Sequence, residues 1–136
     1  MFSLAGKTCV VTGASRGLGR GIALAFAEQG ADVVLAARTK ADLEKVGHEV
    51  EAKGRRAHLV TADITDLAQL QKIADAGVKA FGRVDVWVNN AGADILIGPD
   101  ASLSAVEKLD RLLTVDLRGT ILASWRAAEL LAARPD

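Results

Sequence analysis

Soft metal ligands are scarce in this sequence of 136 residues, which has one cysteine, Cys9, and two histidines, His48 and His58. A single cysteine excludes an internal disulfide, and its place in an apolar run indicates a small buried side chain. That usage fits the reducing cytoplasm. The three side chains stand at no spacing typical of a metal site. We therefore expect a cytoplasmic protein with no metal centre.

The sequence also lacks an excess of either charge and any long hydrophobic run. Acidic and basic side chains number 17 each, which argues against nucleic acid or an anionic membrane surface as a partner. No apolar run approaches the roughly 20 residues of a membrane span, and residues 1–7 do not form a signal peptide. The length suits one domain with a hydrophobic core, spanning residues 1–136.

What the sequence does have is a glycine-rich segment, Thr12–Gly19, directly after the apolar run Cys9–Val11. A strand that turns through glycines into a helix is suited to hold phosphate, because glycine accepts positive φ and lets a ligand approach the backbone. The helix supplies unpaired N–H groups and the positive end of its dipole. The segment therefore predicts a nucleotide bound through its pyrophosphate. The apolar face of the following helix should carry Leu18, Ile22, Ala25 and Phe26.

Four short apolar runs alternate with four helical patterns along the chain. The runs show no polar alternation, which indicates strands buried on both faces of a parallel sheet. Right-handed strand–helix units predict an α/β fold, a Rossmann-like doubly wound parallel sheet of order 3-2-1-4, of which this chain holds the first half. The crevice for a ligand should lie between the first and fourth strands. The predicted strands are Thr8–Thr12, Asp32–Ala37, Ala57–Ala62 and Val84–Asn89.

The later helices are predicted from their caps and apolar stripes. The second should span about Lys40–Lys53 and the third about Asp66–Phe81, and both patterns are followed by a glycine that can end a helix. Ser104 and Glu107 form a capping box for the last helix, which should run to about Ala133. The stripe predicted for the third helix is Leu67, Leu70, Ala74, Val78 and Phe81.

Three motifs, in this order and on these elements, resemble the short-chain dehydrogenase/reductase (SDR) family. They are Thr12-Gly13-x-x-x-Gly17-x-Gly19, then Asp63-Ile64, then Asn89-Asn90-Ala91-Gly92. The glycine pattern alone recurs by chance, but the three together are specific. The resemblance covers the chain as the N-terminal, cofactor-binding half of such an enzyme. It implies a nicotinamide-dependent oxidoreductase that transfers hydride to or from a small carbonyl or alcohol substrate.

The same resemblance implies roles for individual residues. The glycine turn would wrap the pyrophosphate and ribose, Asp63 would accept from the adenine amino group, and Ile64 would pack near the ring. Asn89 would brace the sheet near the first strand. The alternative for Asp63 is a cap of the third helix, for which Asp66 is better placed. The cofactor-binding residues implied in these motifs are Gly13, Ser15, Arg16, Gly17, Leu18, Gly19, Asp63, Ile64, Asn90, Ala91 and Gly92.

The end of the second strand, Ala36-Ala37-Arg38, bears on which cofactor is bound. Folds that prefer NAD usually place an acid there to hold the ribose hydroxyls, and none is present. Arg38 can offer a planar fork of donors to a 2′-phosphate, and Arg16 lies in the loop on the same side. The alternative is two ordinary solvated arginines. Together, and without the acid, they predict NADP(H) in preference to NAD(H).

The chain contains no tyrosine. In the resembled family a Tyr-x-x-x-Lys pair handles the proton and a serine polarises the carbonyl, so we expect the chain to be inactive alone. Asp116 stands where the family commonly has an asparagine that helps hold a relay water, which makes it the one catalytic candidate. Its alternative is a helix carboxylate paired with Arg118, Arg111 or solvent.

Two explanations cover the missing half: a fragment of a longer enzyme, or a short protein that does no chemistry. An uncovered fourth strand and an overly apolar last helix favour the fragment. In the resembled family that helix packs against its twin, so the full-length protein should be a homo-oligomer. The alternative function is a non-catalytic nucleotide-binding or interaction module on the same fold. The apolar helix positions are Leu109, Leu113, Leu117, Ile121, Trp125 and Leu131.

Overall fold

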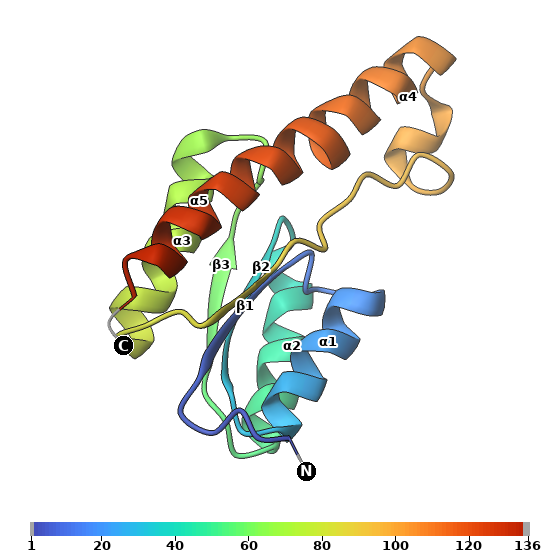
Figure 1. The fold of residues 1–136 in the computed structure, drawn as a ribbon. Helices are drawn as coiled ribbons and strands as arrows, with labels where there is room; N and C mark the ends of the chain where they lie inside the picture. Colours follow the sequence, from blue (N-terminus) through green and yellow to red (C-terminus); the bar gives the residue numbers. More distant parts are fainter. Residues whose placement is uncertain (1, 135–136) are drawn as a thin grey trace.

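Four strands form one parallel sheet in the computed structural model, which describes residues 2–134. The strand order is β3-β2-β1-β4, with every neighbouring pair parallel. This confirms the predicted doubly wound sheet of order 3-2-1-4 (Figure 1). The first two strands match the predicted bounds, whereas the third ends one residue early and the fourth is shorter. The strands are β1 (Thr8–Thr12), β2 (Asp32–Ala37), β3 (Ala57–Thr61) and β4 (Val86–Val88).

Helices cover both faces of this sheet (Figure 1). Helices α1 (Gly17–Glu28) and α2 (Lys40–Ala52) lie on one face, and α3 (Leu67–Phe81) and α5 (Thr120–Ala132) lie on the other. The last predicted helix is one rod that extends beyond the sheet, but it is not α-helical throughout. It consists of α4 (Ala105–Leu112), a π-helical segment η2 (Leu113–Gly119) and α5; a short 3₁₀ turn, η1 (Pro99–Ser102), precedes it.

The core lies on both faces of the two central strands. Val10 and Val34 face α3 and α5, whereas Val11 and Leu35 face α1 and α2. All four side chains are fully buried. Each contributes roughly 1.5–3 kcal/mol relative to an exposed side chain. The unbroken apolar runs seen in the sequence therefore mark strands that are covered on both sides.

The predicted apolar face of α1 is partly wrong. Leu18 is 73% exposed and Ala25 is also exposed, whereas Gly19, Ala23 and Ala27 are buried. The reason is the closeness of the helix to the sheet: a Cβ on Gly19 would lie 2.1 Å from a carbonyl oxygen of the glycine turn. Small residues thus make the closest contact; Leu18 turns outward, whereas Ile22 and Phe26 are partly buried and pack against the core as predicted.

The stripe predicted for α3 is confirmed in part, since Leu70 and Ala74 are buried and Phe81 packs against the core. Leu67 is 58% exposed and Val78 is 44% exposed, whereas Ile73, Ala76 and Gly77 are buried. The helix packs against both the sheet and α5, so its buried arc is wider than one narrow stripe. The predicted caps are confirmed, because Asp66 accepts from the first-turn N–H groups of α3 and Ser104 forms its capping box.

Candidate cofactor-binding site

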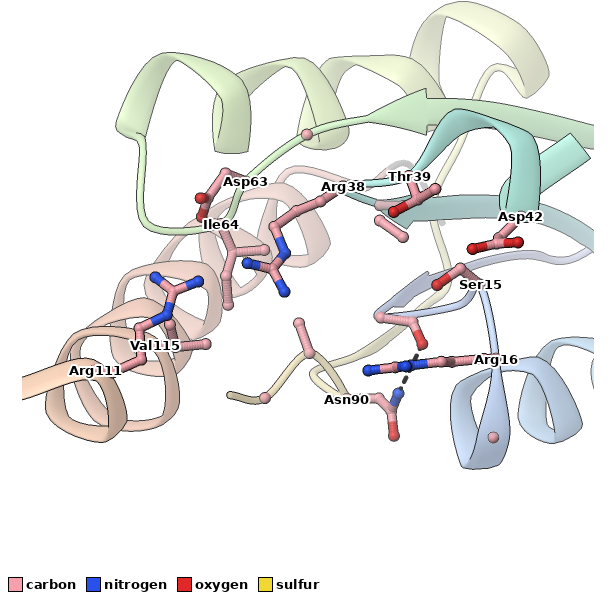
Figure 2. A pocket seen from close by; sticks show the side chains of 17 residues that line it. Ser15, Arg16, Arg38, Thr39, Asp42, Asp63, Ile64, Asn90, Arg111 and Val115 are labelled. Carbon is pink, nitrogen blue, oxygen red and sulfur yellow. Dashed lines mark hydrogen bonds between the residues drawn. The ribbon is translucent and has the colours of Figure 1, made fainter. Parts of the chain in front are cut away.

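A pocket of about 370 Å³ lies where the strands of the sheet end and the glycine turn begins (Figure 2). Its walls come from the turn, from the residues after β2 and β3, from the segment after β4, and from the α4 and η2 parts of the rod. The predicted residues that line it are Gly13, Ser15, Arg16, Gly17, Arg38, Asp63, Ile64, Asn90, Ala91 and Gly92. Leu18 and Gly19 do not line it; Leu18 points to solvent and Gly19 lies beneath the turn.

The glycine turn has the backbone that its sequence requires. Gly13 and Gly17 have φ of 64° and 56°, in the left-handed region. A Cβ on Gly13 would lie 2.8 Å from the Cα of Ala91, so only glycine lets the two segments meet. Helix α1 has no side-chain cap and no acid in its first turn. Its first N–H groups are therefore available to an anion at the pocket.

Hydrogen bonds from Asn90 join the segment after β4 to the glycine turn. The backbone N–H groups of Asn90 and Ala91 donate to Oγ1 of Thr12 at 3.0 and 3.1 Å. Nδ2 of Asn90 donates to the Gly13 carbonyl oxygen at 3.1 Å, the dashed line in Figure 2. These bonds hold the two sides of the crevice in register.

The prediction that Asn89 braces the first strand is wrong. Its Nδ2 donates to Oγ of Ser124 in α5 at 2.9 Å, and its Oδ1 accepts from Trp87. Side chains alternate along a strand, so Asn89 shares the α5 face with Trp87. Asn90 shares the opposite face with Val88 and reaches the turn.

Asp63 lies at the end of β3 as a partly engaged carboxylate. Its Oδ1 accepts from the backbone N–H and the hydroxyl of Thr65 at 2.9 and 2.7 Å. Burial raises the pKa of this carboxyl, but the Thr65 hydrogen bonds and the charges of Arg38 and Arg111 outweigh it, and the pKa lies below its ordinary value. Within residues 2–134, Oδ2 accepts no hydrogen bond. A ligand amino group could bind there.

The pocket is richer in charge than the sequence suggested. Arg16 and Arg38 are exposed, and neither forms an ion pair with a side chain of the described chain. Asp42, in the first turn of α2, also lines the pocket, and Lys45 donates to its carboxylate at 3.2 Å. A carboxylate is thus present near Arg38 after all, although it is already paired with a lysine.

Asp116 belongs to the π-helical segment and is not among the residues that line the pocket. Its Oδ1 accepts from the backbone N–H of Ala93 at 2.8 Å. The alternative pairing with Arg118 or Arg111 is wrong, because Arg118 donates to a backbone carbonyl and Arg111 pairs with Asp100. A carboxylate here ties the rod to the segment after β4.

Sequence reasoning missed several residues that line the pocket. Arg111 and Val115 are four apart on the rod, a spacing that places them on one face, but the stronger apolar stripe of that helix masked them. Thr39 and Asp42 stand at the start of a helix, where polar side chains commonly serve as caps, so their residue types did not indicate a pocket. The missed lining residues are Ala36, Ala37, Thr39, Asp42, Ala62, Arg111 and Val115.

Across residues 2–134, no group of three or more His, Cys, Asp or Glu side chains is arranged to hold a metal ion. Within the same range, none of the helices has the length and apolar character needed to cross a bilayer.

Comparison with known proteins gives consistent matches. The family model described as short chain dehydrogenase matches residues 7–136. An uncharacterized oxidoreductase of Mycobacterium tuberculosis is 45% identical over 108 residues, which cover 79% of this chain and 40% of that protein. A solved metagenomic short-chain oxidoreductase in complex with NADP is 37% identical with a TM-score of 0.82, covering 96% of this chain and 58% of its own.

A second solved structure carries the other nicotinamide cofactor. It is a short chain dehydrogenase from Mycobacterium paratuberculosis bound to NAD, 30% identical, with a TM-score of 0.82, covering 95% of this chain and 52% of its own. This chain therefore spans 40% to 58% of the length of the three proteins. With the sheet order, the site motifs and a match over nearly the whole sequence in agreement, the chain belongs to the short-chain dehydrogenase/reductase family of oxidoreductases.

Proposed function

We propose that this chain binds NADP(H) in the pocket at the glycine turn. In this proposal residues 1–136 are one NAD(P)-binding domain, the cofactor-binding half of an enzyme that transfers hydride between the nicotinamide and a small carbonyl or alcohol. The observation that carries the proposal is a pair of exposed arginines, Arg16 and Arg38, at a pocket that also receives the uncapped end of α1. Positive side chains and free N–H groups there suit a phosphorylated ligand.

The residues present fit such a cofactor. A Cβ at Gly13 or Gly19 would collide with neighbouring backbone, so the cradle depends on glycine. We assign the pyrophosphate to Gly13, Ser15, Gly17 and the N–H groups of α1, with Leu18 and Gly19 forming the turn that positions them. The remaining assignments are adenine at Asp63 and Ile64, the adenosine side at the backbone of Asn90, Ala91 and Gly92, and the 2′-phosphate at Arg16 and Arg38.

NADP(H) is preferred in this proposal because the charges near Arg38 favour a phosphate. The carboxylate of Asp42 also faces this region, but the ammonium of Lys45 is 3.2 Å from it and offsets its charge. Ala37 leaves the end of β2 without an acid to repel the 2′-phosphate. The solved relatives include one in complex with NADP and one bound to NAD. The proposed preference for NADP(H) over NAD(H) therefore rests on the two arginines.

Exchange of Arg38 for an acid tests the assignment. Arg38→Asp should weaken NADPH binding by at least about tenfold and leave NADH binding equal or stronger, because a carboxylate repels the 2′-phosphate and can accept from ribose hydroxyls. Arg118→Gln, outside the pocket, serves as the control. Equal NADPH affinity for the variant and the parent chain would refute the role of Arg38.

We further propose that the 136-residue chain binds cofactor without turning over substrate. The sequence has no tyrosine, so the proton-transfer pair implied by the family would come from outside these residues. Asp116, tied to Ala93, would position the segment after β4 in the complete site. The same lack of tyrosine favours a second candidate, a nucleotide-binding module without chemistry. Readout of the coding sequence after Asp136 separates them, since a downstream Tyr-x-x-x-Lys supports the enzyme.

Association through the α4–α5 rod is the last part of this proposal. A row of apolar side chains along it is exposed, with Trp125 at 66%. An exposed apolar row of this kind favours contact with another protein surface, and we propose a cytoplasmic homo-oligomer for the full-length enzyme. The exposed residues of the row are Leu109, Leu113, Leu117, Ile121 and Trp125.

A further inference from the structure

The pocket wall formed by Arg111 and Val115 has no role in the proposed cofactor site. Arg111 enters the pocket from α4, on the same side as Val115, whereas Arg16 and Ser15 lie on the far side (Figure 2). It therefore differs from Arg16 and Arg38, which come from the loops that follow β1 and β2. A third arginine at this wall has to be explained separately from the 2′-phosphate.

A single ion pair holds Arg111 in place. Its Nε donates to Oδ2 of Asp100 in η1 at 2.9 Å, and the two side chains are 26% and 29% exposed. Between residues 2 and 134, no hydrogen bond or ion pair involves its terminal nitrogens Nη1 and Nη2. One edge of the guanidinium is thus anchored, and the rest is available to a ligand in the pocket.

The space next to Arg111 has the chemistry of a slot for a flat heterocycle. Ile64 and Val115 are each 7% exposed and form an apolar wall. Asp63 supplies a carboxylate oxygen, Oδ2, that no described residue occupies. An apolar wall, a hydrogen-bond acceptor and a planar cation together complement an aromatic base with an exocyclic amino group.

The pKa of Asp63 is consistent with Arg38 and Arg111 lying near its carboxylate. The charge of Arg111, with that of Arg38, is among the causes that lower the pKa of Asp63, after burial that raises it and Thr65 hydrogen bonds that lower it. The carboxylate is therefore kept ionised between two arginines. The guanidinium of Arg38 lies beside Ile64, whereas Arg111 enters from the other side, next to Val115, so the side of the slot nearer to Val115 belongs to Arg111 (Figure 2).

We propose that Arg111 contacts the adenine base directly, with its guanidinium over the ring, and sets the affinity for adenine nucleotides without reading the 2′-phosphate. This inference rests on the proposed cofactor site. The ion pair with Asp100 pre-orients the guanidinium, so the short turn η1 becomes part of the nucleotide site. Asp100→Asn should then weaken adenine nucleotides less than loss of Arg111 itself.

Titration of the 136-residue chain with 5′-AMP and with 2′,5′-ADP tests this role. Arg111→Gln should weaken both ligands by about tenfold, with the ratio of their affinities unchanged, since a cation over an aromatic ring is lost in both cases. Arg111→Lys keeps the charge and can keep the pair with Asp100, but it loses the planar group, so it should be nearly as weak. The matched control Arg118→Gln should stay within about twofold of the parent. Thermal melting of each variant checks folding.

Four outcomes would overturn the inference. Unchanged affinity of Arg111→Gln, or full rescue by Arg111→Lys, would show that the side chain only supports η1. A loss confined to 2′,5′-ADP would assign Arg111 to the phosphate. If the parent chain binds neither nucleotide while folded, the proposed function fails together with this inference, whereas a parent that binds both and a neutral Arg111→Gln refute the inference alone.

Discussion

The region around β1 and β2 is closed, in that its strands are buried beneath helices, whereas the region around β4 and the α4–α5 rod is open, in that much of it is exposed. β1 pairs with β2 over five residues, but β4 pairs with β1 over only three. Every residue of β1 is buried, whereas α4 has no buried residue. The pocket is built mainly on the closed region, although the Gly13 carbonyl oxygen in its glycine turn accepts a hydrogen bond from Asn90 on the open side. The strands that carry most of the pocket are thus buried, whereas the rod presents an exposed apolar row.

Gly19→Ala should have the largest effect on stability and on NADPH binding, because Gly19 makes the tightest contact in the closed region. The new methyl group would lie 2.1 Å from the Gly13 carbonyl oxygen, so we expect about 3 kcal/mol of lost stability and loss of NADPH binding. Gly21→Ala, in the same helix, is the matched control, because apart from the helix's own backbone no atom lies within 4 Å of its Cβ position. It should stabilise by about 0.5–1 kcal/mol. Urea unfolding measures both, and equal stability of the two variants would contradict the packing described.

Asp32→Asn should have the next largest effect, again in the closed region. Asp32 is 4% exposed and pairs with Arg55 and Arg56 at the start of β2. Burial raises its pKa, but the arginine hydrogen bonds hold the pKa below the ordinary 3.8. A depressed folded pKa adds stability that is present above about pH 4 and is lost as pH falls through the folded value.

The variant should therefore lose about 2 kcal/mol near neutral pH, less than a fully buried pair because Arg56 is largely exposed. Its unfolding free energy should also fall less steeply on acidification. Asp110→Asn, an exposed carboxylate, is the control. Parallel acid profiles for parent and Asp32→Asn would contradict this role.

The sequence predicted the closed region better than the open one, for physical reasons. The bounds of β1 and β2 could be predicted because continuous apolar runs are characteristic of strands covered on both faces. The strand order followed from the handedness of strand–helix units. The short extent of β4 could not be predicted from its apolar run, because only three of its residues pair with β1.

Site residues show the same division. Motif residues on the glycine turn and after β4 come together as predicted, because local spacing determines where they lie. The finding that Asn90, and not Asn89, holds the glycine turn required knowledge of which face of the sheet each side chain takes. The position of Arg111 in the pocket wall depends on how a distant helix crosses the sheet. The position of Asp42 there depends on the angle of the first turn of α2. The local sequence spacing predicts neither position.

Asp116→Ala should have a moderate effect at the boundary between the two regions. It removes the acceptor for the Ala93 N–H at 2.8 Å and should lower stability by about 1 kcal/mol. Asp116→Asn keeps an oxygen acceptor and should recover most of that loss. Hydrogen exchange at the Ala93 amide gives a direct reading. Protection that is unchanged in Asp116→Ala would rule out the contact.

Trp125→Ser should have the smallest effect on folding, because it lies on the open side. The side chain is 66% exposed, and surface substitutions usually change stability by less than about 0.5 kcal/mol. Self-association should nevertheless weaken, since the variant removes apolar area from the exposed row. Sedimentation velocity over a range of protein concentrations measures the change. A large loss of stability in the monomer would show that the rod is not the open surface described.

Isothermal titration of the folded 136-residue chain with NADPH and then NADH is the direct test of the proposed cofactor site. We expect one site per chain, with NADPH bound at least about tenfold more tightly because Arg16 and Arg38 contact the 2′-phosphate. The absence of any binding heat in a sample shown to be folded, or an equal or tighter affinity for NADH, would contradict it.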